Sequence, residues 1–299
     1  MKKFVCKVVC FILLLAISDF LSGKMFAYMI SHAKGGENWR NNFICDRVDS
    51  DILVFGSSRA LHHYNPLIIM DSLNMSCYNC GQDGNGAILN YGRYQLILQR
   101  YQPKLLIYDL TSGFDFLEGE DNHKYLGWLK AYYDRPGIAD IFKSIDETEK
   151  YKMQSFFYRY NTKFIQIVSD FIHPLQSDGI FGFRPEEREM DTMKISAIPT
   201  DKHKLDNLKI NYLKKIVIES NSTKVIFVIS PRWNGWNGMN AEEQQFVESF
   251  CQQYNIPFID LSNLFLHENK FFQDGSHLNS RGADEYTRKL IRFIRPYIM

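Results

Sequence analysis

The sequence predicts an α/β fold in which about five parallel strands form one sheet with helices on both of its faces. Two observations carry this prediction: short apolar runs recur along the chain, and segments with helical character lie between them. Parallel neighbours need a long connection, which is usually a helix, so this alternation favours a parallel sheet.

The apolar runs are the expected strands: Ile52–Phe55, Ser76–Cys80, Leu105–Leu110, Val225–Ile229 and Pro257–Leu261. The stretches with helical character are Asn65–Asn74, Ala87–Arg100 and Glu242–Tyr254. We therefore expect a three-layer α/β/α sandwich of the flavodoxin-like kind, in which ligands bind beyond the carboxyl ends of the strands. The residues that fall there are Ser58, Gly84, Thr111 and Pro231.

The N-terminus is typical of a membrane-targeting segment. A basic start, Met1–Lys3, precedes the stretch Phe4–Leu21, which is apolar apart from Lys7 and Ser18-Asp19. About 18 residues is near the lower limit for crossing a bilayer, so a cleaved signal peptide and an uncleaved signal anchor both remain open.

The sequence Ala16-Ile17-Ser18 has the small-x-small form of a signal-peptidase site. The apolar residues that resume from Phe20 to Ile30 instead favour an uncleaved anchor, and we adopt that interpretation. With its lysines on the cytoplasmic side, the anchor would leave the rest of the chain facing outward, into the periplasm or another extracytoplasmic space.

We expect residues 1–30 to form the anchor, residues 31–50 a stalk, and residues 51–299 the main domain. Residues 114–205 interrupt the alternation of strands and helices, and we expect them to be an insertion that caps the strand ends with its own helices. The alternative is a helical crossover with a disordered loop.

Composition limits the classes of function. The chain has 299 residues, of which 45% are apolar, enough for one large domain or two small ones. Its formal net charge of +1 gives no electrostatic reason to expect a nucleic-acid partner. Cys77-x-x-Cys80 has the spacing of a redox or zinc half-site, but it lies in an expected strand and no second C-x-x-C accompanies it, so we expect neither a metal ion nor a cofactor.

The turn after the first expected strand, Gly56-Ser57-Ser58-Arg59, is a candidate nucleophile site. It places Ser58 at the start of the next helix, where unpaired backbone N–H groups and the helix dipole stabilise an oxyanion. The alternative is that Ser57 or Ser58 only caps the helix.

A second motif, Asp274-Gly275-Ser276-His277, lies near the C-terminus. A serine nucleophile needs an imidazole to accept its proton and a carboxylate to orient that imidazole. Asp274 and His277 in one Gly-containing turn can present both groups to the same side. Ser280 is then the expected cap of a C-terminal helix.

Together the two motifs resemble those of the SGNH (GDSL-like) hydrolase superfamily, in which a nucleophilic serine follows the first strand and a D-x-x-H pair precedes the last helix. The resemblance implies that Ser58 is the nucleophile, His277 the general base and Asp274 its orienting carboxylate. It covers residues 50–120 and 205–299, and it is specific at the first and last motifs.

The resemblance also implies an oxyanion hole that includes the backbone N–H groups of Ser58 and Gly84, with Gly81 as the next candidate. The family carries an asparagine after its third strand, but the corresponding stretch, Leu105–Asp115, contains none. The residues that could replace it are Thr111 and Ser112. Otherwise the two backbone groups form the hole alone.

The candidates for substrate binding are Arg59, Thr111, Arg232 and Trp233. The last two belong to Ser230–Gly238, where Trp rings can stack on sugars and the Arg can hold a carboxylate or phosphate. An ordinary Gly/Asn turn with one anchoring Trp is the alternative. The pair His62-His63 either lines the pocket or lies on the surface.

The sequence thus predicts a membrane-anchored serine esterase or O-acyltransferase that acts on acyl esters, in particular acetyl esters, of cell-envelope glycans. Hydrolysis and transfer use the same residues, so both remain open. A non-catalytic module that binds envelope polysaccharide or an assembly partner is the alternative from another class, because the third-block asparagine is missing. A lipase or phospholipase is a further enzyme alternative.

Overall fold

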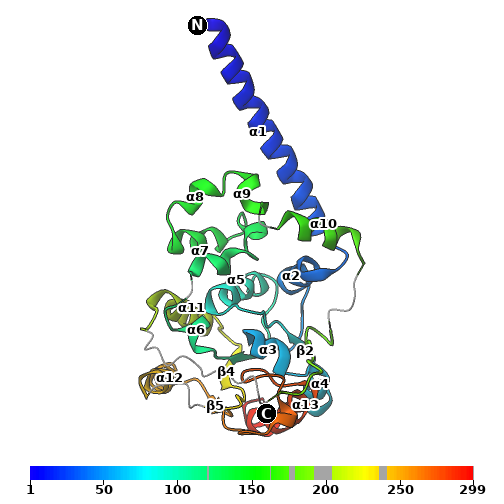
Figure 1. Ribbon diagram of the computed structural model, residues 1–299. Helices are drawn as coiled ribbons and strands as arrows, with labels where there is room; N and C mark the ends of the chain where they lie inside the picture. The colour runs from blue at the N-terminus through cyan, green and yellow to red at the C-terminus, as the bar shows by residue number, and fades with distance from the viewer. Residues whose placement is uncertain (120, 162, 175–178, 192–203, 236–240, 299) are drawn as a thin grey trace. The chain divides into compact units, whose positions relative to one another are not determined.

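The computed structural model describes residues 1–119, 121–161, 163–174, 179–191, 204–235 and 241–298 (Figure 1). Five parallel strands form one sheet in the order β2-β1-β3-β4-β5. The strands are β1 (Ile52–Gly56), β2 (Cys77–Asn79), β3 (Leu105–Asp109), β4 (Lys224–Ile229) and β5 (Phe258–Asp260). The predicted α/β class is therefore confirmed, with the flavodoxin-like strand order.

Helices connect and cover these strands. Those that follow or flank the strands are α3 (Ser58–His63), α4 (Pro66–Leu73), α5 (Ala87–Leu98), α6 (Ser112–Asp115), α11 (Asn207–Ile218), α12 (Ala241–Gln253) and α13 (Ser280–Ile294). Single turns of 3-10 helix are η1 (Asn122–Leu126), η2 (Lys130–Tyr132), η4 (Asn269–Phe271) and η5 (Arg295–Tyr297). The remaining helices are α1 (Lys2–Ser31), α2 (Gly36–Asp46), α7 (Ile138–Ile145), α8 (Glu149–Lys152), α9 (Phe156–Tyr160) and α10 (Phe164–Ile172).

The interior strand β1, which pairs with β2 and β3, shows why an uninterrupted apolar run is needed here. Its residues alternate between the faces of the sheet: Val54 belongs to the core cluster that contains Tyr286 of α13, while the Phe55 ring contacts the Tyr94 ring of α5. All five β1 residues are buried because helices cover both faces. A polar residue in either set would enter an apolar core.

Gly56 ends β1 in a conformation that requires glycine. Its φ is +143°, and a Cβ at this position would lie 2.7 Å from the carbonyl oxygen of Asp109 and 2.9 Å from the Cβ of Ala60. The close approach lets the chain turn directly from the strand into α3. The nucleophile candidate Ser58 is therefore the first residue of α3.

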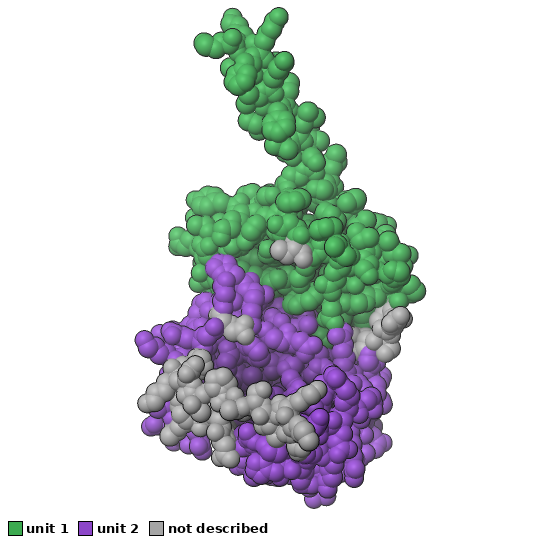
Figure 2. Space-filling model, viewed as in Figure 1, with its two compact units in different colours: residues 1–43, 126–177 green, residues 44–125, 178–299 purple. Residues whose placement is uncertain are grey.

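The chain forms two compact units (Figure 2). Residues 1–43 and 126–177 make one unit, and residues 44–125 and 178–299, which include the whole sheet, make the other. The expected insertion, 114–205, is thus divided between the units, and its residues 192–203 lie outside the described part of the chain. The segment expected to be a stalk, 31–50, contains helix α2.

One part of the expected insertion, residues 179–191, packs in the sheet unit. The backbone N–H of Arg184 donates to the carbonyl of Leu61 in α3, and the N–H of Asn79 donates to the carbonyl of Phe181. The N–H of Met190 donates to the carbonyl of Phe272. This segment therefore runs beside the helix that begins with Ser58.

Helix α1 is long and apolar enough to cross a membrane: its best 18-residue window has a mean hydropathy of 2.4, and none of that window is buried. The C-terminal half of α1 packs instead on protein. The Cβ position of Gly23 lies against the ring of Phe156, and Ile30 forms a small core with Tyr160 and Ile167.

Asp19, the acidic residue that interrupts the apolar stretch, has a structural role. Its carboxylate accepts hydrogen bonds from the backbone N–H groups of Phe156 (3.0 Å) and Phe157 (2.7 Å) and from the hydroxyl of Ser155 (3.0 Å). These N–H groups begin α9 and have no partner within that helix. Asp19 therefore caps α9 and joins it to α1.

Candidate active site

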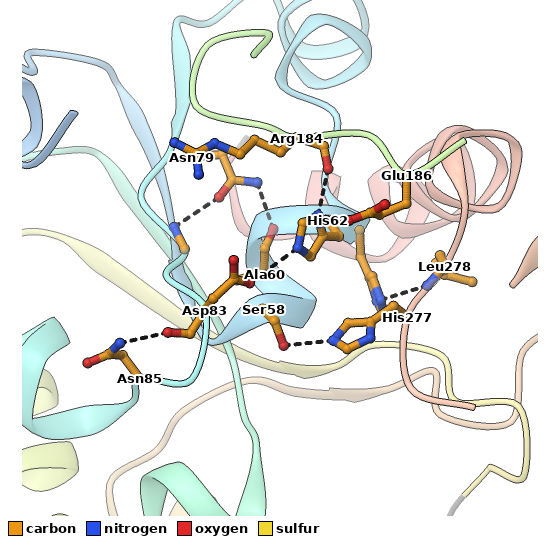
Figure 3. A network of polar contacts seen from close by, with 12 residues as sticks. Ser58, Ala60, His62, Asn79, Asp83, Asn85, Arg184, Glu186, His277 and Leu278 are labelled. Carbon is orange, nitrogen blue, oxygen red and sulfur yellow. Dashed lines mark hydrogen bonds and ion pairs between the residues drawn. The ribbon is translucent and has the colours of Figure 1, made fainter. Parts of the chain in front are cut away.

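Ser58 and His277 meet although 219 residues separate them: the Ser58 Oγ lies 2.8 Å from the His277 Nε2 (Figure 3). Ser58 begins α3, directly after β1, and His277 precedes α13. Both elements pack on the same face of the sheet, in one apolar cluster. The packing of α13 against α3 thus creates the contact.

Asp274 lies on the other side of the histidine ring. Its Oδ2 and Oδ1 are 2.9 Å and 3.1 Å from the His277 Nδ1, and Oδ1 also accepts the backbone N–H groups of Ser276 and His277. Partial burial would raise the pKa of Asp274, but the hydrogen bonds from His277 and Ser276 lower it to about 2. The carboxylate therefore stays ionised at neutral pH.

The partners of His277 define its tautomer. A carboxylate only accepts, so Nδ1 carries the proton, and Nε2 is left to accept the Ser58 hydroxyl proton. Serine, imidazole and carboxylate form one hydrogen-bonded line, which is the order that proton abstraction from a serine requires.

The turn that carries His277 is fixed by its neighbours. The backbone N–H of Trp233, after β4, donates to the carbonyl of Gly275 at 3.2 Å. The N–H of Leu278 donates to the Nε2 of His63 at 3.0 Å. The loop after β4 and the end of α3 therefore both hold this turn.

His63 is a buried, neutral histidine. Its Nε2 accepts from Leu278, so its Nδ1 carries the proton and donates to the Ser230 Oγ at 2.9 Å. Complete burial holds the pKa of His63 well below its ordinary value. A charged ring here would have no acceptor for its second proton at Leu278.

The contacts of His62 favour the protonated form of its ring. Its Nδ1 lies 2.6 Å from the carbonyl oxygen of Arg184, and its Nε2 lies 3.2 Å from the Asp83 Oδ1 (Figure 3). Both partners are acceptors, so a ring that bonds to both carries two protons. Burial opposes this charge, but the hydrogen bonds to Asp83 and Arg184 outweigh it and raise the pKa of His62. The surface alternative for the two histidines is wrong, since both are buried.

The two glycine candidates for the oxyanion hole differ. The N–H of Gly81 already donates to the Asn79 Oδ1 at 3.0 Å, and Gly81 packs tightly against α3. Gly84 adopts a φ of +61° in an open turn, where a Cβ would meet no atom within 4 Å. Within the described residues, the backbone N–H groups of Ser58 and Gly84 have no acceptor.

Thr111 and Arg59 are occupied within the protein. The Thr111 Oγ1 lies 2.7 Å from the Ser57 Oγ, and its backbone N–H donates to the Asp115 Oδ2 at 2.6 Å. Arg59 is buried, pairs with Asp109 at 3.3 Å and donates to the Thr111 Oγ1 at 3.1 Å. Ser57 precedes α3 without a capping bond from its side chain. These contacts join the carboxyl end of β1 to the carboxyl end of β3, next to Ser58.

Trp233 and Arg232 follow β4. The Trp233 indole N–H donates to the Asn269 Oδ1 at 2.7 Å, and its ring contacts His267 edge to face. Trp233 is thus an anchor of its loop. Arg232 lies partly buried beside a small pocket. The remaining candidate stretch, residues 236–238, lies outside the described residues.

Asn79 and Asn85 were not singled out from the sequence. Asn79 is buried in β2 and donates to the carbonyls of Ala60 and Tyr64, which stabilises the end of α3. Asn85 follows Gly84 and donates one amide N–H to the carbonyl of Asp83 at 2.7 Å (Figure 3). The signal that could have singled out Asn85 is its place directly after Gly84, the expected oxyanion glycine.

The fold and the site together define an α/β protein with a serine, a histidine and a carboxylate in one hydrogen-bonded line at the carboxyl ends of parallel strands. This is the arrangement that the resemblance to SGNH hydrolases implies. No protein-family model and no curated protein matches the chain.

Solved structures resemble the chain at low identity. A candidate platelet activating factor from Streptococcus pneumonia is 10% identical, with a TM-score of 0.41 over 97% of this chain and 99% of that one. A candidate lipolytic protein of the G-D-S-L family from Desulfitobacterium hafniense is 11% identical, with a TM-score of 0.38 over 83% and 99%. An active-site mutant of a family two carbohydrate esterase from Clostridium thermocellum is 9% identical, with a TM-score of 0.35 over 82% and 63%. Because identities and TM-scores are this low, these likenesses carry no information on substrate or activity.

Proposed function

We propose that the chain is a serine esterase or O-acyltransferase that acts on acyl esters, in particular acetyl esters, of cell-envelope glycans. The observation that carries the proposal is the line from Ser58 through His277 to Asp274, with 2.8 Å and 2.9 Å between the bonded atoms. These contacts support the proposal because nucleophilic attack by serine needs a base beside the hydroxyl and a carboxylate behind that base.

In the proposed reaction the Ser58 Oγ attacks the ester carbonyl carbon while its proton passes to the His277 Nε2. When the tetrahedral intermediate collapses, the single bond between the acyl carbon and the alcohol oxygen breaks. The leaving alcohol takes the proton from His277. Water or a sugar hydroxyl then attacks the acyl-serine, with His277 again as the base, and Ser58 regains its proton. The attacking group decides between hydrolysis and transfer.

Two backbone donors are available for the oxyanion of the intermediate. The N–H groups of Ser58 and Gly84 have no acceptor within the described residues. The hydrogen bond between His62 and Asp83 holds the turn that contains Gly84.

The proposal of a cell-envelope substrate is based on helix α1, which is long and apolar enough to span a membrane. In this proposal α1 is an uncleaved anchor, with Lys2, Lys3 and Lys7 on the cytoplasmic side and the sheet unit outside. Envelope glycans are then the acylated polymers within reach of the site.

Ester turnover by the full chain in detergent tests the proposal, with 4-nitrophenyl acetate and acetylated glycan fragments as substrates. We expect Ser58→Ala to lower kcat by about 10³-fold or more. Ser222→Ala, which changes an exposed serine that bonds to Gln102, is the matched control and should retain full activity. Full activity in a folded Ser58→Ala protein would overturn the assignment.

A further inference from the structure

The unit of residues 1–43 and 126–177 exposes large apolar side chains on three consecutive helices, α8, α9 and α10. Among its described residues outside α1, the large apolar side chains that are half or more exposed all belong to these helices: Tyr151, Phe157, Phe164, Ile165 and Ile172. We call these five residues the apolar patch. In the described part of the sheet unit, which is far longer, only Phe181 and Ile218 are as exposed. Such a concentration indicates an interaction surface.

The helices that carry the apolar patch pack against α1. They lie on the side of their unit from which α1 projects (Figure 1). The carboxylate of Asp19 in α1 accepts the first N–H groups of α9, and the Phe20 ring contacts the Phe156 ring edge to face. Further along α1, the Tyr28 ring contacts the Phe171 ring of α10. The apolar patch therefore lies beside the helix that is apolar enough to cross a membrane.

The lysines of α1 indicate where a bilayer would end. The helix rises about 31 Å from Lys3 to Lys24, at 1.5 Å per residue. This length matches the hydrocarbon thickness of about 30 Å, with one lysine at each boundary. Asp19, to which the start of α9 is bonded, then falls about 7 Å inside the outer boundary. Measured from Lys7, it would lie deeper still. The start of α9 is therefore level with the outer leaflet.

The charges around the apolar patch suit lipid headgroups. The only acidic residue in the sequence from 150 to 174 is Asp170, which is buried and accepts hydrogen bonds from Asn38. The basic residues of this segment are Lys150, Lys152, Arg159 and Lys163. Ion pairs with acidic residues outside the segment, Asp146 and Asp134, involve Lys152 and Arg159. The excess positive charge thus comes from Lys150 and Lys163, beside exposed aromatic rings, as is typical of a membrane interface.

We propose that the apolar patch lies in the outer leaflet of the membrane that α1 crosses. Phe157, at the start of α9, enters the hydrocarbon. The patch residues of α10 lie at the level of the headgroups, because α10 contacts a later part of α1. The inference rests on the anchor in the proposed function and not on the esterase chemistry. A partner protein that covers the same side chains is the alternative.

Spin labels can measure the depth of single side chains in the full chain, reconstituted into vesicles of phosphatidylethanolamine and phosphatidylglycerol. Of the native cysteines, Cys6 and Cys10 of α1 are exposed and the others are buried. Labels are therefore placed one at a time by Phe157→Cys, Ile165→Cys or Ile218→Cys in a chain that also carries Cys6→Ser and Cys10→Ser. For each label, collisions with oxygen, which concentrates in lipid, are compared with collisions with a water-soluble nickel chelate.

Ile218→Cys is the matched control, because Ile218 is an exposed isoleucine of α11 in the sheet unit. We expect the ratio of oxygen to nickel collisions to be highest for the label at Phe157, lower at Ile165 and lowest at Ile218. Equal ratios at Phe157 and Ile218 would overturn the inference and leave the patch to a partner protein. Equal ratios at Ile165 and Ile218 would overturn the placement of α10. All three side chains are exposed, so the substitutions should leave the fold intact, which circular dichroism checks.

A label on the native Cys10, in a chain with Cys6→Ser, separates this inference from the proposed function. This label should lie in the hydrocarbon if α1 is an anchor. If the Cys10 label is in lipid and the Phe157 label is in water, the anchor stands and the inference fails. If the Phe157 label is in lipid and the Cys10 label is in water, the anchor fails and the patch stands. None of these measurements uses turnover, so loss of the esterase assignment would not change their result.

Discussion

The Nε2 of His63 accepts the backbone N–H of Leu278 at 3.0 Å, so the helix that begins with Ser58 also holds the turn that carries His277. Helix α3 has only six residues, from Ser58 to His63. The distance between the candidate nucleophile and the candidate base is therefore set by one rigid turn of helix. His63 is a positioning residue, and its test follows from this contact.

His63→Ala should lower kcat by about 10-fold to 100-fold with little change in KM, because Leu278 and its neighbour His277 lose their support. The unpaired N–H should also cost about 1–3 kcal/mol of stability. Steady-state kinetics and urea unfolding measure both effects. His63→Gln offers an acceptor to Leu278 and should recover part of kcat; an unchanged kcat in His63→Ala would contradict the positioning role.

The charge of His62 predicts a pH dependence. Its pKa in the folded protein is raised above the ordinary 6.5. A raised histidine pKa stabilises the fold fully below the unfolded value, and this stabilisation is lost as pH rises through the folded pKa. The difference in unfolding free energy between the parent protein and His62→Gln should therefore be largest below pH 6.5 and shrink above it. Urea titrations at several pH values measure it, and a difference that grows with pH would exclude the charged state.

Alanine at Gly81 should destabilise the protein far more than alanine at Gly84. A Cβ on Gly81 would lie 2.4 Å from the backbone nitrogen of Leu61, so Gly81→Ala should unfold the protein or displace α3. A Cβ on Gly84 meets no atom within 4 Å, and its positive φ costs about 1–2 kcal/mol. Thermal unfolding of both variants tests this contrast, which fails if Gly84→Ala is the less stable of the two.

Asp274→Asn should keep the fold and lower kcat by about 10²-fold or more, because an amide can favour the wrong tautomer of His277. The side chain of Asp274 is half exposed, so little stability depends on it. Kinetics with 4-nitrophenyl acetate measure the loss. A folded Asp274→Asn protein with full kcat would show that His277 needs no orienting carboxylate.

The sheet could be predicted from the sequence because local features specify it. The runs at Ile52 and Leu105 are apolar on both faces, and the strands formed there, Ile52–Gly56 and Leu105–Asp109, each match the expected run to within one residue. The prediction of Ser280 as the cap of α13 is wrong by one residue. The side chain of Asn279 accepts the N–H of Gly282, while Ser280 is the first residue of the helix. Both residue types are good caps, so local preference does not separate them.

Contacts across the fold could not be predicted in the same way. His62 and His63 are adjacent in sequence, yet the pKa of one is raised and that of the other lowered. Their partners Asp83, Arg184 and Leu278 reach them from three other segments. Asp19 likewise appeared only as an interruption of an apolar stretch, and its partners follow 136 residues later. Such roles depend on tertiary packing, which sequence spacing does not contain.

Labelling with a fluorophosphonate probe tests the central claim most directly, since such a probe reacts with an activated serine. We predict one adduct by intact mass, on the peptide that contains Ser58, with no labelling of Ser58→Ala and slower labelling of His277→Ala. A natively folded protein that takes up no probe, or one labelled at a different serine, would contradict the account.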